Sequence, residues 1–253
     1  MDVTTGVNCN SGGGNCPDSF GCDDAPSNFC IKRHDTKPEF RVNVEDCDGP
    51  IPEDDGLILE INMWSKARLK TTLESDVDHF YLADNIGFYQ IMVDDIIVVD
   101  QIRMPEQMKV VGFDESNKIV FVERGYNDTT PQKHLKGTLL RIFRAKDFPA
   151  QIEFVYEDVL QIDGSVKNQL VNTFLVCPWI PEMTCLPGCY WLEFKLIKMN
   201  VSFLNHISNI SYTFDLSPND YGCSHDANIE WIRRFPLSGE GFLIKIIDSP
   251  TAE

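Results

Sequence analysis

Apolar and polar residues alternate in short runs along the chain from about residue 56 onward. In the first half the runs are 57–64, 67–73, 79–84, 95–104, 108–114, 118–125 and 138–144, with turn residues between them. A period of two places successive side chains on opposite faces of an extended strand, and short strands at regular spacing are typical of a small barrel or sandwich. The pattern therefore predicts a small all-β module over residues 56–147.

The same texture continues after a linker-like segment around Pro149. The runs here are 151–159, 169–176, 189–199, 211–216, 229–235 and 241–248, and they are rich in aromatic and β-branched residues. Such residues suit a pleated, half-buried surface. Residues 148–253 are therefore predicted to form a second β-domain, a β-sandwich of the immunoglobulin-like kind.

The first 55 residues lack any strand or helix periodicity. The stretch "NCNSGGGNCPDSFGCDDAPSNFC", residues 8–30, consists mainly of Gly, Asn, Asp, Ser, Pro and Cys. Segments of this composition bury too little apolar surface to order themselves. We expect residues 1–55 to form an extended Cys-rich arm that is held in place by cross-links, a metal or a neighbouring subunit.

Net charge narrows the classes of partner. The 253-residue chain carries a formal charge of −17. Nucleic-acid binding depends on clustered Lys and Arg, so this charge argues against it. It fits solubility and assembly against basic protein surfaces.

No secretion signal and no apolar run of about 18 residues is present. The sequence thus predicts a protein made in a cytosol, without membrane insertion. Thiols in that compartment usually stay reduced.

The nine cysteines leave three alternatives open. In the arm, Cys9, Cys16, Cys22 and Cys30 could form disulfides, bind zinc together with His34, or remain free thiols. Short CxxC knuckles, common in structural zinc sites, are missing, which weakens the metal alternative. We therefore predict no firm metal or cofactor site.

A second group of cysteines lies in the C-terminal half. Cys177, Cys185, Cys189 and Cys223 are candidates for disulfides, the alternative being small buried apolar residues. Because the total is odd, at least one cysteine is unpaired within the chain or cross-linked to a neighbour.

No catalytic constellation emerges. Ser224, His225 and Asp226 are consecutive, and neighbouring residues on extended backbone point to opposite faces, so they cannot align as a triad. Acidic pairs are expected by chance in so acidic a chain. We predict that the protein is not an enzyme.

One stretch resembles a known family. Residues 71–144 resemble a small β module that recurs in structural proteins of tailed bacteriophages, and they end in the pattern RGxxxTTxxxHxxG. The pattern positions in this chain are Arg124, Gly125, Thr129, Thr130, His134 and Gly137. The family usually has glycine at the position of Asp128. In that family the module is a scaffold, so the resemblance implies that His134 holds a structural hairpin rather than acting as a general base.

A shorter stretch, "LPGCYWLEFKLIKM" (186–199), is similar to a strand of immunoglobulin-like domains that attach phage baseplate or fibre parts. Together the two resemblances imply a virion protein made in the host cytoplasm. It would be a symmetric homo-oligomer that contacts other virion structural proteins, most readily in the tail, baseplate or neck. Capsid decoration or a fibre or receptor-binding role is the alternative, and a tail-associated hydrolase of polysaccharide or peptidoglycan is the third.

Overall fold

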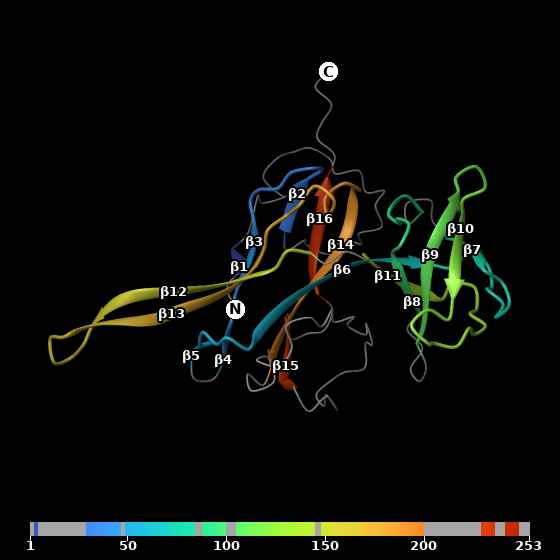
Figure 1. Ribbon diagram of the computed structural model, residues 1–253. Coiled ribbons are helices and arrows are strands. Elements are labelled where there is room, and N and C mark those ends of the chain that lie inside the picture. The colour runs from blue at the N-terminus through green and yellow to red at the C-terminus, as the bar shows by residue number, and fades with distance from the viewer. Residues whose placement is uncertain are drawn as a thin grey trace, which may run out of the picture.

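The protein is described by a computed structural model. It describes residues 3–4, 29–46, 49–83, 88–99, 105–144, 148–199, 229–235 and 241–247. The elements within these ranges are β-strands (Figure 1), which confirms the all-β prediction. No helix of the described residues is long and apolar enough to cross a membrane.

The large sheet is mixed. Its strand order is β2 (Phe29–Lys32), β16 (Phe242–Ile247), β14 (Gly188–Met199), β6 (Leu57–Arg68), β11 (Leu139–Phe143), β8 (Ile96–Val99), β9 (Glu106–Asp114), β10 (Ile119–Arg124) and β7 (His79–Tyr81). A further strand, β15 (Ile229–Phe235), also pairs with β14. The β2–β16 pair is parallel, and the other adjacent pairs are antiparallel.

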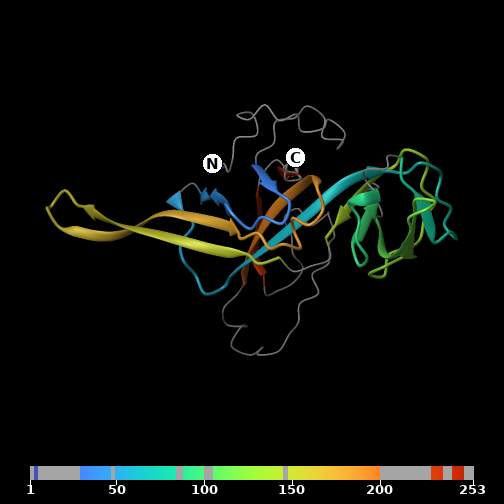
Figure 2. The ribbon, with the colours of Figure 1, turned by 90° about the horizontal axis from the view of Figure 1, so that it is seen from above.

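A smaller antiparallel sheet has the order β1 (Val3–Thr4), β3 (Phe40–Asn43), β13 (Val166–Cys177) and β12 (Gln151–Leu160). Of the residues of β13, only Phe174–Cys177 pair with β3. The β12–β13 hairpin therefore continues beyond the sheet as a two-stranded ribbon, which projects from the body in Figures 1 and 2. A two-stranded sheet is formed by β4 (Glu45–Asp46) and β5 (Gly49–Pro50).

Strand β6 joins two separate hydrophobic cores. Ile61 and Met63 pack in a cluster built from β2, β3, β13, β14 and β16, whereas Ala67 packs in a cluster built from β7 to β11. All three share one face of the strand, because they are spaced by two or four residues. The buried Ser65 lies between them on that face and separates the cores. Figure 2 shows β6 running from the body to the module of β7–β11.

The structure corrects two details of the strand prediction. The runs 57–64 and 67–73 were expected to be two strands, but β6 is continuous to Arg68. The polar Ser65–Lys66 pair does not interrupt it, because both residues keep their ladder pairing with β11. The run 95–104 yields a strand only over Ile96–Val99. The predicted strand 211–216, and the part of the arm before Phe29 other than β1, lie outside the described residues.

Candidate functional site

The loop between β10 and β11 is built around a buried carboxylate. Glu106, the first residue of β9, is completely buried, as is His134 in the loop. Arg124, the last residue of β10, donates from Nε to Glu106 Oε1 at 2.5 Å and from Nη2 to Oε2 at 2.9 Å. The Nε2 of His134 lies 2.6 Å from the same Oε2, which also accepts from the Gln132 backbone N–H at 2.9 Å. Both oxygens of Glu106 are therefore bound within the fold.

Arg124 also ties the loop to neighbouring backbone. Its Nη1 donates to the carbonyl oxygens of Glu74 at 2.9 Å and Val77 at 2.7 Å, and its Nη2 donates to that of Gln132 at 2.7 Å. His134 pairs with Leu73 through two backbone hydrogen bonds. These contacts make Arg124 and His134 fixed points of the module interior.

The remaining pattern residues shape the backbone of the loop. Gly125 has φ +67°, and a Cβ there would lie 2.8 Å from the Thr129 carbonyl oxygen, so the position requires glycine. Asn127 and Asp128 have φ values of 53° and 58°. Asn and Asp tolerate this left-handed conformation better than other side chains do. Glycine at the position of Asp128 would suit the same backbone.

Thr129 and Gly137 fix the two ends of the loop. The Gln107 backbone N–H donates to Thr129 Oγ1 at 3.0 Å, and this hydroxyl donates to the Tyr126 carbonyl at 2.8 Å. Gly137 has φ +85° and donates from its backbone to Leu69 O at 2.8 Å. Thr130 is exposed. The structure therefore brings Arg124, Thr129 and His134 together around the start of β9.

The electrostatics of the network favour an ionised Glu106. Burial by itself would raise the pKa of this carboxyl group, but the hydrogen bonds from His134, Arg124 and the Gln132 backbone outweigh it and lower the pKa to about 2. A completely buried carboxylate whose two oxygens both accept hydrogen bonds within the fold cannot be reached by a substrate. The arrangement can orient a loop, but it presents no reactive atom at the surface.

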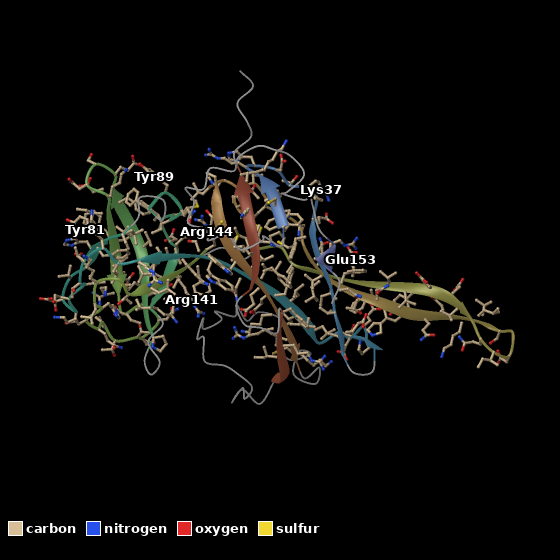
Figure 3. The ribbon with its side chains drawn as sticks, turned by 180° about the vertical axis from the view of Figure 1, so that it is seen from behind. Lys37, Tyr81, Tyr89, Arg141, Arg144 and Glu153 are labelled. Atoms are coloured by element: carbon tan, nitrogen blue, oxygen red, sulfur yellow. The ribbon has the colours of Figure 1, made fainter. Side chains whose placement is uncertain are left out.

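A second buried ion pair, not anticipated from the sequence, lies where the module meets the body. Arg144 donates from Nη1 to Asp95 Oδ2 at 3.0 Å and from Nη2 to the Tyr190 hydroxyl at 3.2 Å. Its side chain lies at the body-facing edge of the module in Figure 3. Burial raises the pKa of Tyr190 to about 12. Because Asp95 precedes β8 and Tyr190 lies on β14, this cluster fixes the module against the body.

A close backbone approach supports the same junction. Gly188 has φ +148°, and a Cβ there would lie 1.9 Å from Gln90 Nε2. A larger residue here would adopt an unfavourable φ and would force the Gln90 side chain to move. A Pro-Gly pair before a strand indicates a turn, but it gives no sign of the contact with Gln90.

Four of the cysteines for which disulfides were considered lie in the described part of the chain. Cys177 and Cys185 are free thiols, so the prediction of disulfides at these two is wrong. The physical reason for Cys177 is its place in the body core, where it is completely buried and where burial raises its pKa. Cys30 and Cys189 are buried on β2 and β14. They are not free thiols but are disulfide-bonded.

Cys30 and Cys189 occupy opposite sides of one strand. Both are paired with Lys245 of β16. A disulfide needs Cα atoms within about 7 Å, and two residues separated by an intervening strand lie at about twice the strand spacing of roughly 4.8 Å. They are therefore not bonded to each other.

The metal alternative involves residues that the structure describes only in part. Among the described residues no group of three or more metal-binding side chains occurs. Cys30 is buried on β2, whereas His34 follows the strand on an exposed turn with φ +64°. The other candidates, Cys9, Cys16 and Cys22, lie outside the described residues, as do Cys223 and the Ser224–His225–Asp226 run.

The β12–β13 ribbon, residues 151–177, exposes apolar side chains near its tip. Tyr156 is 46% exposed, Leu160 72%, Ile162 110% and Val166 64%. At its base, Glu153 forms an ion pair with Arg41 of β3, and the Tyr156 hydroxyl donates to Glu53 at 2.8 Å. Glu153 is labelled near this base in Figure 3. Four exposed apolar residues on one projection are typical of an interaction surface.

No family model matches the chain, and no curated protein matches its sequence significantly.

Proposed function

We propose that the protein is a non-enzymatic structural component of a tailed-phage particle, placed in the tail, baseplate or neck. In this proposal residues 56–147 are the small scaffold module and residues 148–253 an immunoglobulin-like domain. The arm, residues 1–55, contributes β2 and β3 to the sheets of the body, and the arm and both β-domains contact neighbouring subunits. The protein is made in the host cytoplasm and ends in the virion.

The proposal is supported chiefly by the inward orientation of two residues of the RGxxxTTxxxHxxG pattern. Arg124 and His134, the chemically versatile residues of the pattern, are turned inward onto Glu106, with side-chain exposures of 7%, 0% and 0%. A catalytic histidine must reach a substrate, at least through one water. A histidine that is fully buried and bound to a carboxylate serves instead to hold the loop, as a scaffold requires.

The ribbon supports the assembling part of the proposal. Its exposed apolar residues lie on a projection rather than in a concave pocket. Small-molecule sites are usually concave, whereas projecting strands can contribute to a neighbouring subunit. The acidic charge of the chain then favours neighbours with basic surfaces.

The test is to find the protein in its particle. Phage particles from a culture that produces this chain would be purified on a density gradient, and their proteins quantified by mass spectrometry. We expect the chain in stoichiometric amounts, and immunogold labelling at the tail, baseplate or neck. Label over the head or at the fibre tips would favour the decoration or receptor-binding alternative.

Two results would overturn the proposal. The first is absence of the chain from particles that contain the other virion proteins. The second is turnover of host envelope polysaccharide or peptidoglycan by the purified chain, which would indicate the hydrolase.

A further inference from the structure

The outer part of the ribbon has one apolar face. In the β12–β13 register Leu160 is paired with Val166, Asp158 with Asn168, and Tyr156 with Leu170. These three pairs share a face, because they are separated by two residues along each strand. The alternate pairs, Val159 with Lys167 and Glu157 with Gln169, lie on the opposite face. The first face therefore reads apolar, polar, apolar from the tip inward.

Within the described ranges, Glu53 contacts the inner end of this face through the Tyr156 hydroxyl, and the outer end is open to water. Leu160 and Val166 are 72% and 64% exposed, and β3 pairs with β13 only from Phe174 onward. An isolated two-stranded hairpin is at best marginally stable in water. A ribbon that leaves its apolar face in water gains little from its own packing, so its natural state is one in which another surface covers that face.

We propose that this face is covered by the same face of a second copy of the chain, with the two ribbons antiparallel. The inference rests on the proposed assembling role and deepens it by naming the partner and the surface. A symmetric contact must be self-complementary. The apolar–polar–apolar order is self-complementary. When the second ribbon runs in the opposite direction, the Leu160–Val166 pair of each copy lies over the Tyr156–Leu170 pair of the other.

The centre of the contact is then the Asp158–Asn168 pair of both copies. In the antiparallel arrangement each β12 lies over the β12 of the other copy, so the two Asp158 carboxylates face each other. The Asn168 side chains lie beside them and can donate hydrogen bonds to these carboxylates. The remaining carboxylate repulsion limits the affinity, and it gives the proposal a specific signature.

Charge and shape favour this arrangement over two others. Parallel ribbons would bring both bodies to the same end, and each body is wider than its ribbon in Figures 1 and 2. Edge-to-edge pairing of two β12 strands would place Glu153, Glu157 and Asp158 along one seam without any Lys or Arg of that strand. Like charges directly opposite each other destabilise such a pair.

The net charge of −17 does not prevent the contact. A ten-residue strand spans about 33 Å, whereas the screening length at physiological salt is about 8 Å. Bodies held at opposite ends of two antiparallel ribbons are therefore largely screened from each other. The face is small compared with a standard interface, so we expect a dimer with a dissociation constant in the micromolar range.

Sedimentation equilibrium of the purified full chain at concentrations from about 1 to about 200 μM tests the proposal. The wild type is expected to dimerise reversibly. Replacing Leu160 and Val166 together by Thr keeps β-propensity but removes apolar surface, and we expect dimerisation at least about tenfold weaker. The matched control replaces Val93 and Leu135 by Thr, which are 50% and 64% exposed and lie outside the ribbon. It should dimerise as the wild type does.

A gain-of-affinity variant excludes misfolding as an explanation. Asp158→Asn removes the facing carboxylates and should tighten the dimer by about two- to tenfold. Glu157→Gln, which removes an equal charge on the opposite face, should leave it unchanged.

A monomeric wild type, a Leu160/Val166 variant that dimerises like the wild type, a control that loses dimerisation equally, or an Asp158→Asn variant no tighter than Glu157→Gln would each overturn the inference. None of these results bears on whether the chain is found in particles, so the two proposals fail separately.

Discussion

The β10–β11 loop buries polar side chains, whereas the β12–β13 ribbon exposes apolar side chains to water. The loop buries polar and charged side chains and binds them within the module: Arg124 and His134 both contact Glu106. The ribbon takes apolar groups outside and leaves them uncovered, with Leu160 and Val166 mostly exposed. A closed polar network stabilises one chain by itself, whereas an open apolar face is stabilised only by contact. In our proposal the loop therefore serves folding and the ribbon serves assembly.

We expect the largest effect on stability when the polar network of the loop loses its carboxylate. Glu106→Gln removes the carboxylate and leaves Arg124 buried without its anion. Breaking a buried ion pair on one side typically costs about 3–5 kcal/mol. We expect a loss of that order in the free energy of unfolding, measured in urea. Glu123→Gln, an exposed residue of the same strand β10, is the control and should change stability by less than about 0.5 kcal/mol.

An equal stability of Glu106→Gln and Glu123→Gln would show that the network does not hold the loop. The ribbon should be unaffected by either change, so dimerisation per folded chain stays constant.

Acid should weaken the loop through the same carboxylate. Its folded-state pKa of about 2 lies below the ordinary value of 4.5, so the stabilisation is complete above about pH 4.5 and is lost as the pH falls through 2. The shift corresponds to about 3 kcal/mol. The measurement is the difference in unfolding free energy between wild type and Glu106→Gln, which should shrink steadily between pH 4.5 and pH 2. A difference that is constant over this range would contradict the assignment.

Alanine substitutions at one glycine of the loop and one of the ribbon turn should have smaller effects on stability. Gly125 in the loop and Gly164 in the ribbon turn both have positive φ, +67° and +83°. A Cβ at Gly125 meets the Thr129 carbonyl oxygen at 2.8 Å, whereas a Cβ at Gly164 meets nothing within 4 Å. Alanine should cost about 1 kcal/mol at either position for the backbone conformation, and about 1–2 kcal/mol more at Gly125 for the contact. Thermal unfolding of the two variants measures the difference, and an equal loss would mean that the loop can relax as freely as the ribbon turn.

The sequence by itself determined the all-β class and much of the backbone of the loop. Alternation located β9, β10 and β11, because a period of two can be satisfied only by extended chain. Gly125, Asn127 and Asp128 are residue types that suit the left-handed backbone found at their positions, because few residue types tolerate it. These are local properties, and local properties can be recognised from neighbouring letters.

Tertiary structure alone decided which distant groups meet. Glu106 stands 28 positions before His134 in a polar stretch with no distinguishing signal, and only the pairing of β9 with β10 brings it beneath the loop. Likewise, alternation defines an apolar face on β12 without saying what covers it. The outer residues of that face, such as Leu160, are mostly exposed, and β3 is only four residues long, so the ribbon has no further strand beside β13 before Phe174. Periodicity assigns side chains to a face of a strand, but only the packing of strands against one another decides whether that face meets protein or water.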